Sequence, residues 1–527
     1  MTTPNESPSI AEDTASESPA ADLIRSDADR TAILAKQGSI TFAGDVIKKI
    51  FGFLIIAVIT RLVSPVVYGL FTIAVALVLF IQTLAGLGLP KAVDYFVPQY
   101  LDGRDEASAR GVIYTAGTLV LISSSLVAVA LVVLRWHIAD LFGEPALAFA
   151  LLLLAVTLPL LAIYNILLAS FNAIKQLQYR VYMRDFARPT VRLLTTAGLL
   201  LAGFGLIGIV VGYVVGLLVA VCVGAALLVR NAPELVRGSV DTAAPRPMLS
   251  YAAPLAVAGL IYVILGQIDY FIIGLLGTAE GVGIYRVGYA LAANLLIVFT
   301  AVSPVFKPLI AEVRQNDESV QRQYRTATRW VAGLTLPLAL VLSLGASAYL
   351  SLIFTAQYTA ASLAVAILAV GYLFNVTCGG PDGALLQGLG YPRLVFLNTS
   401  LLLGINTVGS ALLVPRFGIT GAAIGTATAL TVAGLAAISE VYIVRGIHPL
   451  TPSLGKFFLS AIPAALAGGL VVIIFSPLVV AVMLPIVVIG VYAIFVVASG
   501  ALNDADVAFA AQFGPKAEEL VAIAADR

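Results

Sequence analysis

Long apolar runs, separated by short polar, glycine- or proline-containing stretches, recur along most of the 527-residue chain. A helix that crosses about 30 Å of hydrocarbon needs about 20 mostly apolar residues. Each of fourteen such runs predicts a membrane-spanning helix, because backbone polar groups inside a bilayer must bond to one another. The predicted spans are 41–62, 66–89, 111–134, 147–170, 189–206, 208–229, 251–276, 283–306, 330–353, 360–388, 393–414, 419–444, 456–476 and 479–499.

The composition agrees with this pattern. Hydrophobic residues make up 60% of the chain and charged residues 11%, with a mean hydropathy of +1.01. Average soluble domains are about 45–50% apolar and about 25% charged. So few charges exclude a soluble enzyme, a nucleic-acid-binding protein and a disordered protein. The sequence therefore predicts an all-α polytopic membrane protein with about 14 transmembrane helices.

The first 37 residues differ from the rest, being rich in Ser, Thr, Pro and acidic residues, and they predict a disordered leader. This leader lacks the basic segment and apolar run of a signal peptide. Cys222 and Cys378 both lie inside apolar runs, so neither a disulfide framework nor a metal site is expected. The two histidines, His137 and His448, lie at span ends, and no cofactor is expected either.

The basic residues are distributed unevenly across the predicted topology. Lys and Arg number 30 against 29 acidic residues, giving a net charge of +1. Of these 30, 26 fall on the side of the N-terminus. The predicted location is the cell membrane, and the positive-inside rule then places both termini in the cytoplasm. The four on the other side are Arg61, Arg135, Arg286 and Arg416.

An internal repeat runs through the chain. Residues 60–77 align without a gap on 274–291, so that Gly69 corresponds to Gly283. Two further matches have nearly the same offset, 105–110 on 317–322 and 204–212 on 417–425. The offset of 212 to 214 residues equals six spans. The repeat therefore predicts two parallel-related six-helix bundles, and sites in such transporters usually lie between the repeats near mid-membrane.

This repeat predicts the domain organisation. Two extra C-terminal helices follow the second bundle, and a basic, proline-containing stretch joins the bundles. The predicted units are a leader at 1–37, bundles at 38–230 and 249–445, a cytoplasmic linker at 231–248, helices 13 and 14 at 446–500, and a cytoplasmic tail at 501–527.

Several segments carry a resemblance to a known family. They are RLVSPVVYGLFTIA followed by LAGLGLPKAVDYFVPQY, residues 387–426, and the span around Asp269 followed by GVGIY. Together they resemble polysaccharide-type flippases of the multidrug/oligosaccharidyl-lipid/polysaccharide exporter superfamily. The resemblance covers about 38–500. It implies transport of an oligosaccharide on a polyprenyl- or dolichyl-phosphate carrier from the cytoplasmic to the outer leaflet.

Ionisable groups inside spans are the first candidates for a site, because each costs at least about 2.5–3.5 kcal/mol at mid-helix. Lys48 and Lys49 follow Asp45 by three and four residues, so Asp45 is placed to pair with either. Two interpretations stay open. The lysines snorkel beside this local pair, or they form a cationic inner rim for the carrier phosphate, with Asp45 a candidate for ion coupling.

Asp269 has no basic residue nearby on its own helix, which makes it a candidate proton or cation site. Its alternative role is a packing acid bonded to Tyr or Gln. Arg61 and Arg286, near the outer ends of spans 1 and 8, are candidates for binding a pyrophosphate, because guanidinium binds phosphate bidentately. Pairing of Asp269 with Arg286 and simple snorkelling are the other possibilities.

Three further features are polar. Asp382 follows a helix break at Gly379-Gly380-Pro381 and is a candidate for ion coupling, although kinked packing explains the break nearly as well. Gln267 and Asn294 suit sugar hydroxyls or interhelical bonds. The basic loop at 175–192 predicts a face for anionic membrane lipids, or simply sets the topology.

The leading functional hypothesis is an alternating-access flippase for a lipid-linked oligosaccharide or polysaccharide precursor. The alternative within the same fold is a cation-coupled exporter of small molecules or drugs. An enzyme is not expected, because the outer loops are short and DxD patterns occur only in the leader and tail. A scaffold among glycan-assembly enzymes stays open, and no nucleic-acid partner is expected.

Overall fold

The computed structural model describes residues 43–241, 245–300 and 315–502, with the single positions 306, 310, 313, 506, 519 and 522. The predicted leader and most of the predicted tail lie outside these residues. Within them every regular element is a helix. In chain order these are residues 43–62, α2 (Pro65–Ala85), α3 (Leu89–Asp102), α4 (Glu106–Leu141), α5 (Pro145–Leu154), α6 (Thr157–Ala173), α7 (Leu177–Val181), the π-helix η1 (Tyr182–Ala187), α8 (Arg188–Leu201), α9 (Gly205–Asn231), η2 (Pro233–Leu235), α10 (Pro245–Leu276), α11 (Ala279–Ala292), η3 (Ala293–Leu295), α13 (Asp317–Ile353), η4 (Ala356–Ala361), α14 (Ser362–Phe374), the π-helix η5 (Asn375–Gly379), α15 (Gly380–Gly388), α16 (Pro392–Arg445), α17 (Pro452–Ile474) and α18 (Pro477–Ala498).

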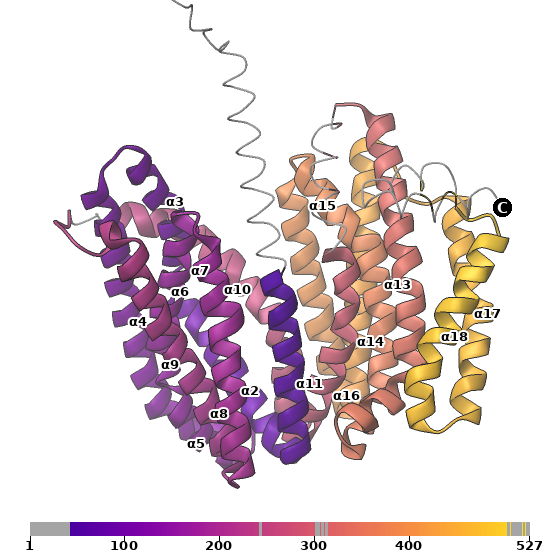
Figure 1. The fold of residues 1–527 in the computed structure, drawn as a ribbon, viewed down its shortest axis with the longest axis horizontal. Helices are drawn as coiled ribbons and strands as arrows, with labels where there is room; N and C mark the ends of the chain where they lie inside the picture. The colour runs from indigo at the N-terminus through magenta and orange to yellow at the C-terminus, as the bar shows by residue number, and fades with distance from the viewer. Residues whose placement is uncertain are drawn as a thin grey trace, which may run out of the picture.

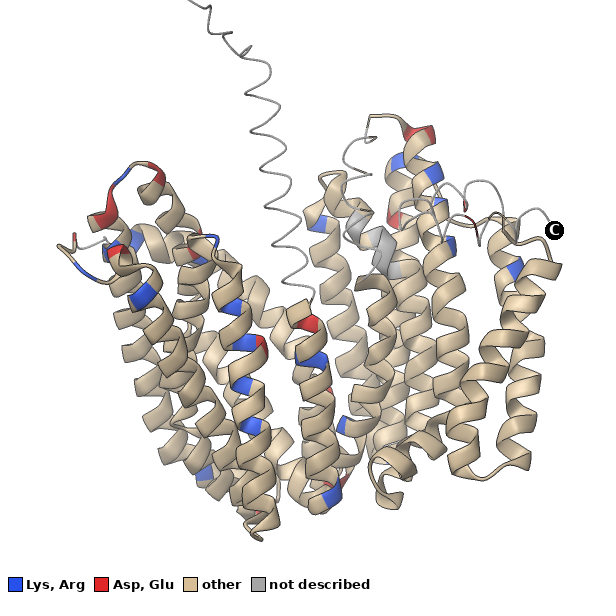
Figure 2. Ribbon diagram, in the orientation of Figure 1, with Lys and Arg blue, Asp and Glu red and all other residues tan. Residues whose placement is uncertain are grey.

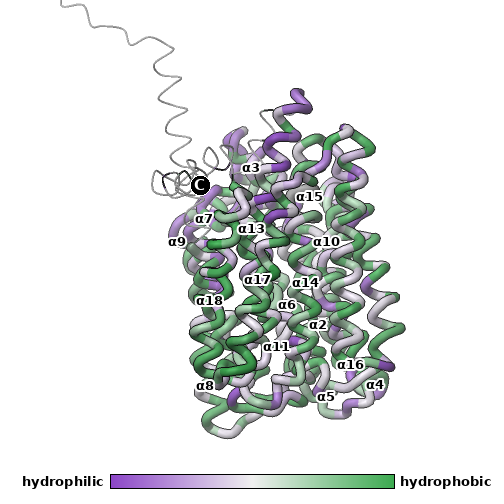
Figure 3. The backbone as a smooth tube through the Cα atoms, turned by 90° about the vertical axis from the view of Figure 1, so that its right-hand side faces the viewer, coloured by the Kyte–Doolittle hydropathy of each residue, from purple (hydrophilic) through white to green (hydrophobic). Residues whose placement is uncertain are grey.

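Most helices of the first half gather on one side of the molecule and most of the second half on the other, whereas α10 is labelled beside the first group (Figure 1). Helix 43–62 and α11 lie between them, and α17 and α18 form the far edge of the second group. Charged residues collect at the end that carries α3, and the helix bodies are largely hydrophobic (Figures 2 and 3). We call this the basic end; Lys91, Arg104 and Arg230 lie there. The opposite end is where α2, α9 and α11 begin.

The described residues contain ten helices long and apolar enough to cross a membrane, with mean hydropathies of 1.7 to 2.9. The pair α5 and α6, bent by 43°, adds an eleventh if it forms one span. The chain is therefore a multi-pass membrane protein, as predicted, although the count of fourteen is not confirmed. One helix, α16, covers two predicted spans, 393–414 and 419–444, and breaks at Gly418, whose φ of 54° and ψ of −133° are not helical.

The sequence pattern gave no indication of α3, which lies between two predicted spans. Its charged residues, among them Lys91 and Asp94, interrupt the apolar run, so the segment fails any test for a crossing. The next helix, α4, begins at Asp105, whose side chain accepts a hydrogen bond from the Ser108 N–H at 3.0 Å. This bond lowers the pKa of Asp105 below its ordinary value, because it stabilises the carboxylate.

Glycines at repeat-related positions make the same contacts in both halves. A Cβ atom on Gly69 would overlap the carbonyl of Ala279, and one on Gly283 would overlap the carbonyl of Pro65. Pro65 and Ala279 are also 214 residues apart, so the crossing of α2 and α11 is two-fold symmetric. Two more aligned glycines behave alike: Gly212 packs against Thr196, and Gly425 against Ser410.

The Gly69–Gly283 crossing gives a stability prediction. Gly69→Ala is expected to lower the free energy of unfolding by about 1–3 kcal/mol, because the new methyl group meets backbone rather than a movable side chain. Gly198→Ala on α8 is the matched control, since a Cβ atom there meets nothing within 4 Å. Thermal unfolding of the purified chain in detergent measures both. Equal stability of the two variants would show that the crossing tolerates a side chain.

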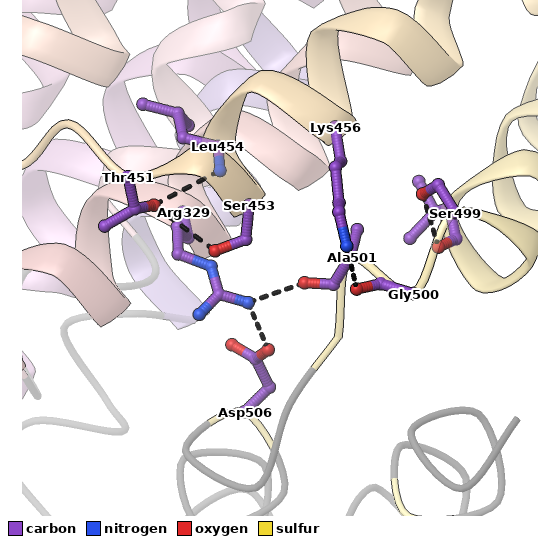
Figure 4. Close-up of polar contacts among 10 residues, drawn as sticks. Arg329, Thr451, Ser453, Leu454, Lys456, Ser499, Gly500, Ala501 and Asp506 are labelled. Carbon is purple, nitrogen blue, oxygen red and sulfur yellow. Dashed lines mark hydrogen bonds and ion pairs between the residues drawn. The ribbon is translucent and has the colours of Figure 1, made fainter.

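A buried ion pair attaches the start of the predicted tail to the second half. The Arg329 guanidinium of α13 donates to the Asp506 carboxylate at 2.5 Å and to the Ala501 carbonyl at 2.7 Å (Figure 4). Both side chains of the pair are nearly inaccessible, at 4% and 2% exposure. Lys456 of α17 donates to the neighbouring Gly500 carbonyl at 3.0 Å.

Breaking this pair on one side is expected to destabilise the chain. Arg329→Met leaves the Asp506 carboxylate buried without its cation, and loss of one partner of a buried pair costs about 3–5 kcal/mol. The double variant Arg329→Met/Asp506→Asn should recover part of this loss, because no uncompensated charge stays behind. Unfolding midpoints of the two variants make the comparison, and no recovery in the double variant would contradict it.

Candidate functional site

Two neighbouring cavities are lined by residues of both halves. The wider, of about 520 Å³, lies towards the basic end, and the deeper one is about 190 Å³. They share the lining residues Leu79 and Gln267, so the two cavities lie next to each other. Residues from helix 43–62, α2, α8, α10 and α11 line the deeper cavity, so both repeats build it. This is the location that the repeat predicted for a transport site.

Two arginines supply the charge of the deeper cavity. Arg286 of α11 donates to the Tyr270 hydroxyl at 2.7 Å, and its guanidinium lies 5.4 Å from the centre of the same ring. Arg192 of α8 lies 5.0 Å from the ring centre of Tyr213 and 5.7 Å from that of Phe71. The aromatic rings therefore hold both guanidinium groups in place without neutralising them.

Neither arginine has a carboxylate partner among the ion pairs of the described residues. Within the described part of the chain, Arg192 also has a buried Nε without a hydrogen-bond acceptor. A buried donor without an acceptor is costly, and a guanidinium matches the geometry of phosphate. The deeper cavity is therefore suited chemically to an anionic group with several acceptor oxygens.

The wider cavity is lined by uncharged hydrogen-bonding groups as well as cations. The amides among them are Gln82, Asn165, Asn172 and Gln267, and the cations are Lys91, Arg180 and Arg188. Among the described lining residues one carboxylate occurs, that of Asp94, which pairs with Lys91 at 3.2 Å and accepts from Asn172 at 3.3 Å. Such a surface has donors and acceptors for a polyhydroxylated group.

Asp269 forms a separate polar centre inside the second half, where it is 5% exposed. Its carboxylate accepts hydrogen bonds from Tyr285 at 2.8 Å, Thr426 at 2.9 Å and Asn406 at 3.1 Å. The amide oxygen of Asn406 also accepts from Ser410 at 3.0 Å. A carboxylate with hydroxyl and amide oxygens around it is the ligand chemistry of hard cations.

The two polar centres occupy equivalent places in the repeat. At offsets of 214 residues, and 213 for the last, the counterparts of Asp269, Tyr285, Asn406 and Thr426 are Ile55, Phe71, Arg192 and Tyr213. The second half thus holds a carboxylate where the first half holds an aliphatic residue. The first half holds a guanidinium, Arg192, where the second holds the Asn406 amide. The equivalent region of the fold therefore carries a carboxylate in the second half and, at another of its positions, a guanidinium in the first half.

Neighbouring residues connect the Asp269 centre to the deeper cavity. Asp269 and Tyr270 are consecutive on α10, and Tyr285 and Arg286 are consecutive on α11. Asp269 bonds Tyr285, and Tyr270 bonds Arg286, while the two tyrosine rings lie 6.2 Å apart, edge to face. The pairing of Asp269 with Arg286, one of the possibilities left open by the sequence, is not formed, because each of the two side chains bonds a tyrosine instead.

The sequence-based candidates divide into those that the cavities include and those that they do not. Arg286 and Gln267 line the deeper cavity. Arg61 does not. Its Nε donates to the Ile353 carbonyl at 2.9 Å and a terminal nitrogen donates to Leu352, so it satisfies carbonyls at the end of α13. Arg61 thus joins the two halves at the opposite end, and the expectation that it lines a binding site with Arg286 is not met.

The three charged candidates of helix 43–62 also lie elsewhere than expected. Lys48 and Lys49 are exposed and line neither cavity. Asp45 pairs with Arg184 at 2.9 Å rather than with either lysine. Asp45 pairs with a residue of another helix because the Arg184 guanidinium is already held in position by Asp185 at 2.6 Å.

The last two candidates, Asn294 and Asp382, are not among the described residues that line the two cavities. Asn294 is exposed and donates to the Ala290 carbonyl of its own helix at 2.9 Å. The predicted break in span 10 is the π-helix η5, and α15 follows it. Asp382 belongs to α15, but its side chain lies outside the described residues.

Sequence reasoning missed Arg180, Arg188 and Arg192 as cavity residues, because it assigned the basic stretch 175–192 to lipid headgroups or to topology, although the predicted span 189–206 already included Arg192. The structure shows that this stretch is helical, as α7, η1 and α8. Basic positions recur along that path in Figure 2. With Arg184 these arginines are spaced four residues apart, a helical signal that could have extended the predicted span 189–206 towards the N-terminus.

Comparison with known proteins gives a family and a fold. Residues 58–363 match the family described as "Polysaccharide biosynthesis protein". A relative from Haloferax volcanii, "Probable flippase AglR", is 25% identical over 221 residues, which is 40% of this chain and 43% of that protein. The chain spans less than half the length of the curated relatives that it matches.

Solved structures share the fold at low identity. The lipid II flippase MurJ in an inward closed conformation matches with a TM-score of 0.68 and 16% identity, covering 88% of this chain and 98% of that one. An inward-facing multidrug resistance transporter of the MATE family and MOP superfamily matches with 0.63 and 15%, covering 76% and 94%. The named functions in these comparisons are flippase and transporter, not enzyme.

Proposed function

The chain belongs to the polysaccharide biosynthesis protein family, and we propose that it is a flippase for a lipid-linked oligosaccharide or polysaccharide precursor. The observation that carries this proposal is the pair Arg192 and Arg286, which line one cavity between the halves and have no carboxylate partner among the described residues. A phosphate joined to both a sugar and a lipid supplies the missing anion. The polar wider cavity then takes the sugars.

The carrier in this proposal is a polyprenyl or dolichyl phosphate whose tail stays in the bilayer. The basic end faces the cytoplasm, as the positive-inside rule requires, and both termini lie there. The substrate thus moves from the cytoplasmic to the outer leaflet of the cell membrane. Glycan-assembly enzymes would use it on the outer side.

Alternating access between the two bundles, 38–230 and 249–445, provides the path. The wider cavity lies towards the basic end, whereas Gly69–Gly283 packing and the Arg61 contact with α13 join the halves at the opposite end. This arrangement corresponds to an inward-open cavity. Opening of the opposite end requires these contacts to separate.

Asp269 is the proposed site of ion coupling. A cation or proton there competes for the carboxylate with the Tyr285 hydroxyl. Because Tyr285 precedes Arg286 on α11, release of Tyr285 moves the helix that carries the cavity cation. Binding at Asp269 and binding at Arg286 therefore favour different positions of α11, which is the requirement for coupling two sites.

The second candidate is a cation-coupled exporter of small molecules, and the oxygen-rich Asp269 centre is the observation that favours it. The cavity charge argues against its usual cargo. A cationic drug would meet Arg192 and Arg286, and like charges at short range in a cavity of low dielectric repel.

Reconstitution into vesicles tests the proposed function. Purified chain should accelerate leaflet exchange of a fluorescent polyprenyl-diphosphate oligosaccharide, measured by quenching of the label exposed outside. Protein-free vesicles and vesicles with the Arg192→Gln/Arg286→Gln variant are the controls. Absence of acceleration with verified incorporation would reject the flippase proposal, and export of a fluorescent organic cation instead would favour the alternative.

A further inference from the structure

Four arginines follow one helical path from the basic end into the deeper cavity. Arg180, Arg184, Arg188 and Arg192 stand four residues apart on α7, η1 and α8. At a rise of about 1.5 Å per residue, the twelve residues cover about 18 Å, more than half the thickness of a bilayer core. We call these residues the arginine ladder.

The π-helix η1 helps keep the ladder on one face. Four residues exceed one turn of an α-helix, so a four-residue repeat drifts in one direction around it. A turn of π-helix, with its i→i+5 bonds, contains more than four residues. A step of four residues is therefore shorter than one turn there, and the side chains drift around the helix in the opposite direction. The outcome is visible in the lining. Arg180 and Arg188 line the wider cavity, and Arg192 lines the deeper one.

One rung differs from the others. Arg184 pairs with Asp185 at 2.6 Å and with Asp45 of helix 43–62 at 2.9 Å, so its charge is compensated. In the described part of the chain, no ion pair includes Arg180, Arg188 or Arg192. Arg184 therefore anchors the helix, and the other three are available to an anion.

Aromatic rings position the middle rung. The Arg188 guanidinium lies 5.0 Å from the ring centre of Tyr164 and 5.4 Å from that of Tyr213. Tyr213 is also the ring beside Arg192, at 5.0 Å. The two guanidinium groups thus stand on one shared aromatic surface, and two like charges held there without a counter-ion attract a multivalent anion.

We infer that Arg180 and Arg188 form a loading site for the phosphate of the lipid carrier, distinct from the deep pair Arg192 and Arg286, and that the phosphate passes from Arg188 to Arg192. This inference rests on the proposed function. Arg188 and Arg192 stand about one helical turn apart, so a phosphate can gain a charge-assisted bond to Arg192 before it loses the one to Arg188. The anion is therefore never left unpaired in a medium of low dielectric.

Binding of a soluble probe separates the loading site from general charge effects. Farnesyl diphosphate is added to the purified full chain in neutral nanodiscs. Arg180→Gln and Arg188→Gln should each weaken binding by about tenfold, and Arg188→Lys by less, because the charge stays. Arg237→Gln is the matched control, since Arg237 is exposed near the same end and lines neither cavity.

A second variant keeps the test decisive if an arginine variant fails to fold. Asn165→Asp keeps the side chain size and places a carboxylate in the wider cavity beside the ladder. It should also weaken farnesyl diphosphate binding by about tenfold, because the new charge competes for the same cations. The measurement is then repeated in nanodiscs that contain phosphatidylglycerol. If this lipid abolishes binding of farnesyl diphosphate, the ligand of the arginines is the headgroup of the bulk lipid.

Transport measurements distinguish loading from the deep step. Loading-site variants should raise the substrate concentration for half-maximal rate, whereas Arg192→Gln should lower the maximal rate. If the wild type transports substrate and Arg180→Gln, Arg188→Gln and Asn165→Asp all bind the probe like the wild type, the loading site is wrong and the proposed function stands. If the wild type neither binds nor transports, the proposed function itself fails.

Discussion

Arg286→Gln is expected to slow transport of a lipid-linked diphosphate by about 10- to 100-fold without reducing the amount of folded protein. A hydrogen bond to a charged group contributes about 1.5–3 kcal/mol, and a factor of ten in rate corresponds to about 1.4 kcal/mol. The loss is expected in transport rather than in stability, because the Arg286 guanidinium donates to a neutral hydroxyl, that of Tyr270. Removal of the cation therefore leaves no buried carboxylate without a partner.

Three comparisons isolate the role of this charge. Arg286→Lys should retain more activity than Arg286→Gln, because it keeps a cation but loses the bidentate fork. Arg416→Gln removes an exposed arginine from the second half and should transport like the wild type. Arg192→Gln/Arg286→Gln should be slower than either single variant. Rates of leaflet exchange in vesicles of equal protein content measure all of them, and wild-type transport by Arg286→Gln would remove this residue from the site.

The sequence predicted the positions of helices better than their partners. Most apolar runs correspond to helices within a few residues. The reason is that the thickness of the hydrocarbon layer sets the length of a crossing helix, and an apolar run of that length is visible in the sequence. The segment α3 was missed for the same reason. It contains Lys91 and Asp94 and so carries no signal of a crossing. The repeat was visible in the sequence because both halves have a glycine, Gly69 and Gly283, at a helix crossing where a Cβ atom would overlap backbone.

Charge partners were the weakest part of the sequence-based prediction. Asp45 was expected to pair along its own helix, and it pairs with Arg184, 139 residues away. Arg61 and Arg286 were expected together, yet one caps α13 and the other lines the cavity. Sequence spacing describes neighbours on one helix, whereas the angles between helices decide which charges meet. Asp269 was identified because an acid in an apolar run requires partners wherever its helix lies.

Asp269→Asn is expected to make transport independent of the driving cation. Asn has the same size and keeps an oxygen that can accept from Tyr285 and Thr426, so the fold should persist. The charge that attracts a cation is lost. Coupling free energies between sites are typically about 1–3 kcal/mol, so the stimulation by an imposed ion gradient should fall by about 5- to 150-fold. Sodium and proton gradients applied separately show which ion acts.

The residue that transmits this coupling is tested in the same assay. Tyr285→Phe keeps the ring that packs 6.2 Å from Tyr270 but removes the hydroxyl that bonds Asp269. Its basal transport should persist while its response to the gradient weakens, because Arg286 keeps its place and only the connection is lost. Glu440→Gln is the control, since this acid of α16 accepts from Asn398 at 2.7 Å and lines neither cavity. A full gradient response in Asp269→Asn would place ion coupling elsewhere, whereas a full response in Tyr285→Phe alone would leave Asp269 as the ion site and require another route to α11.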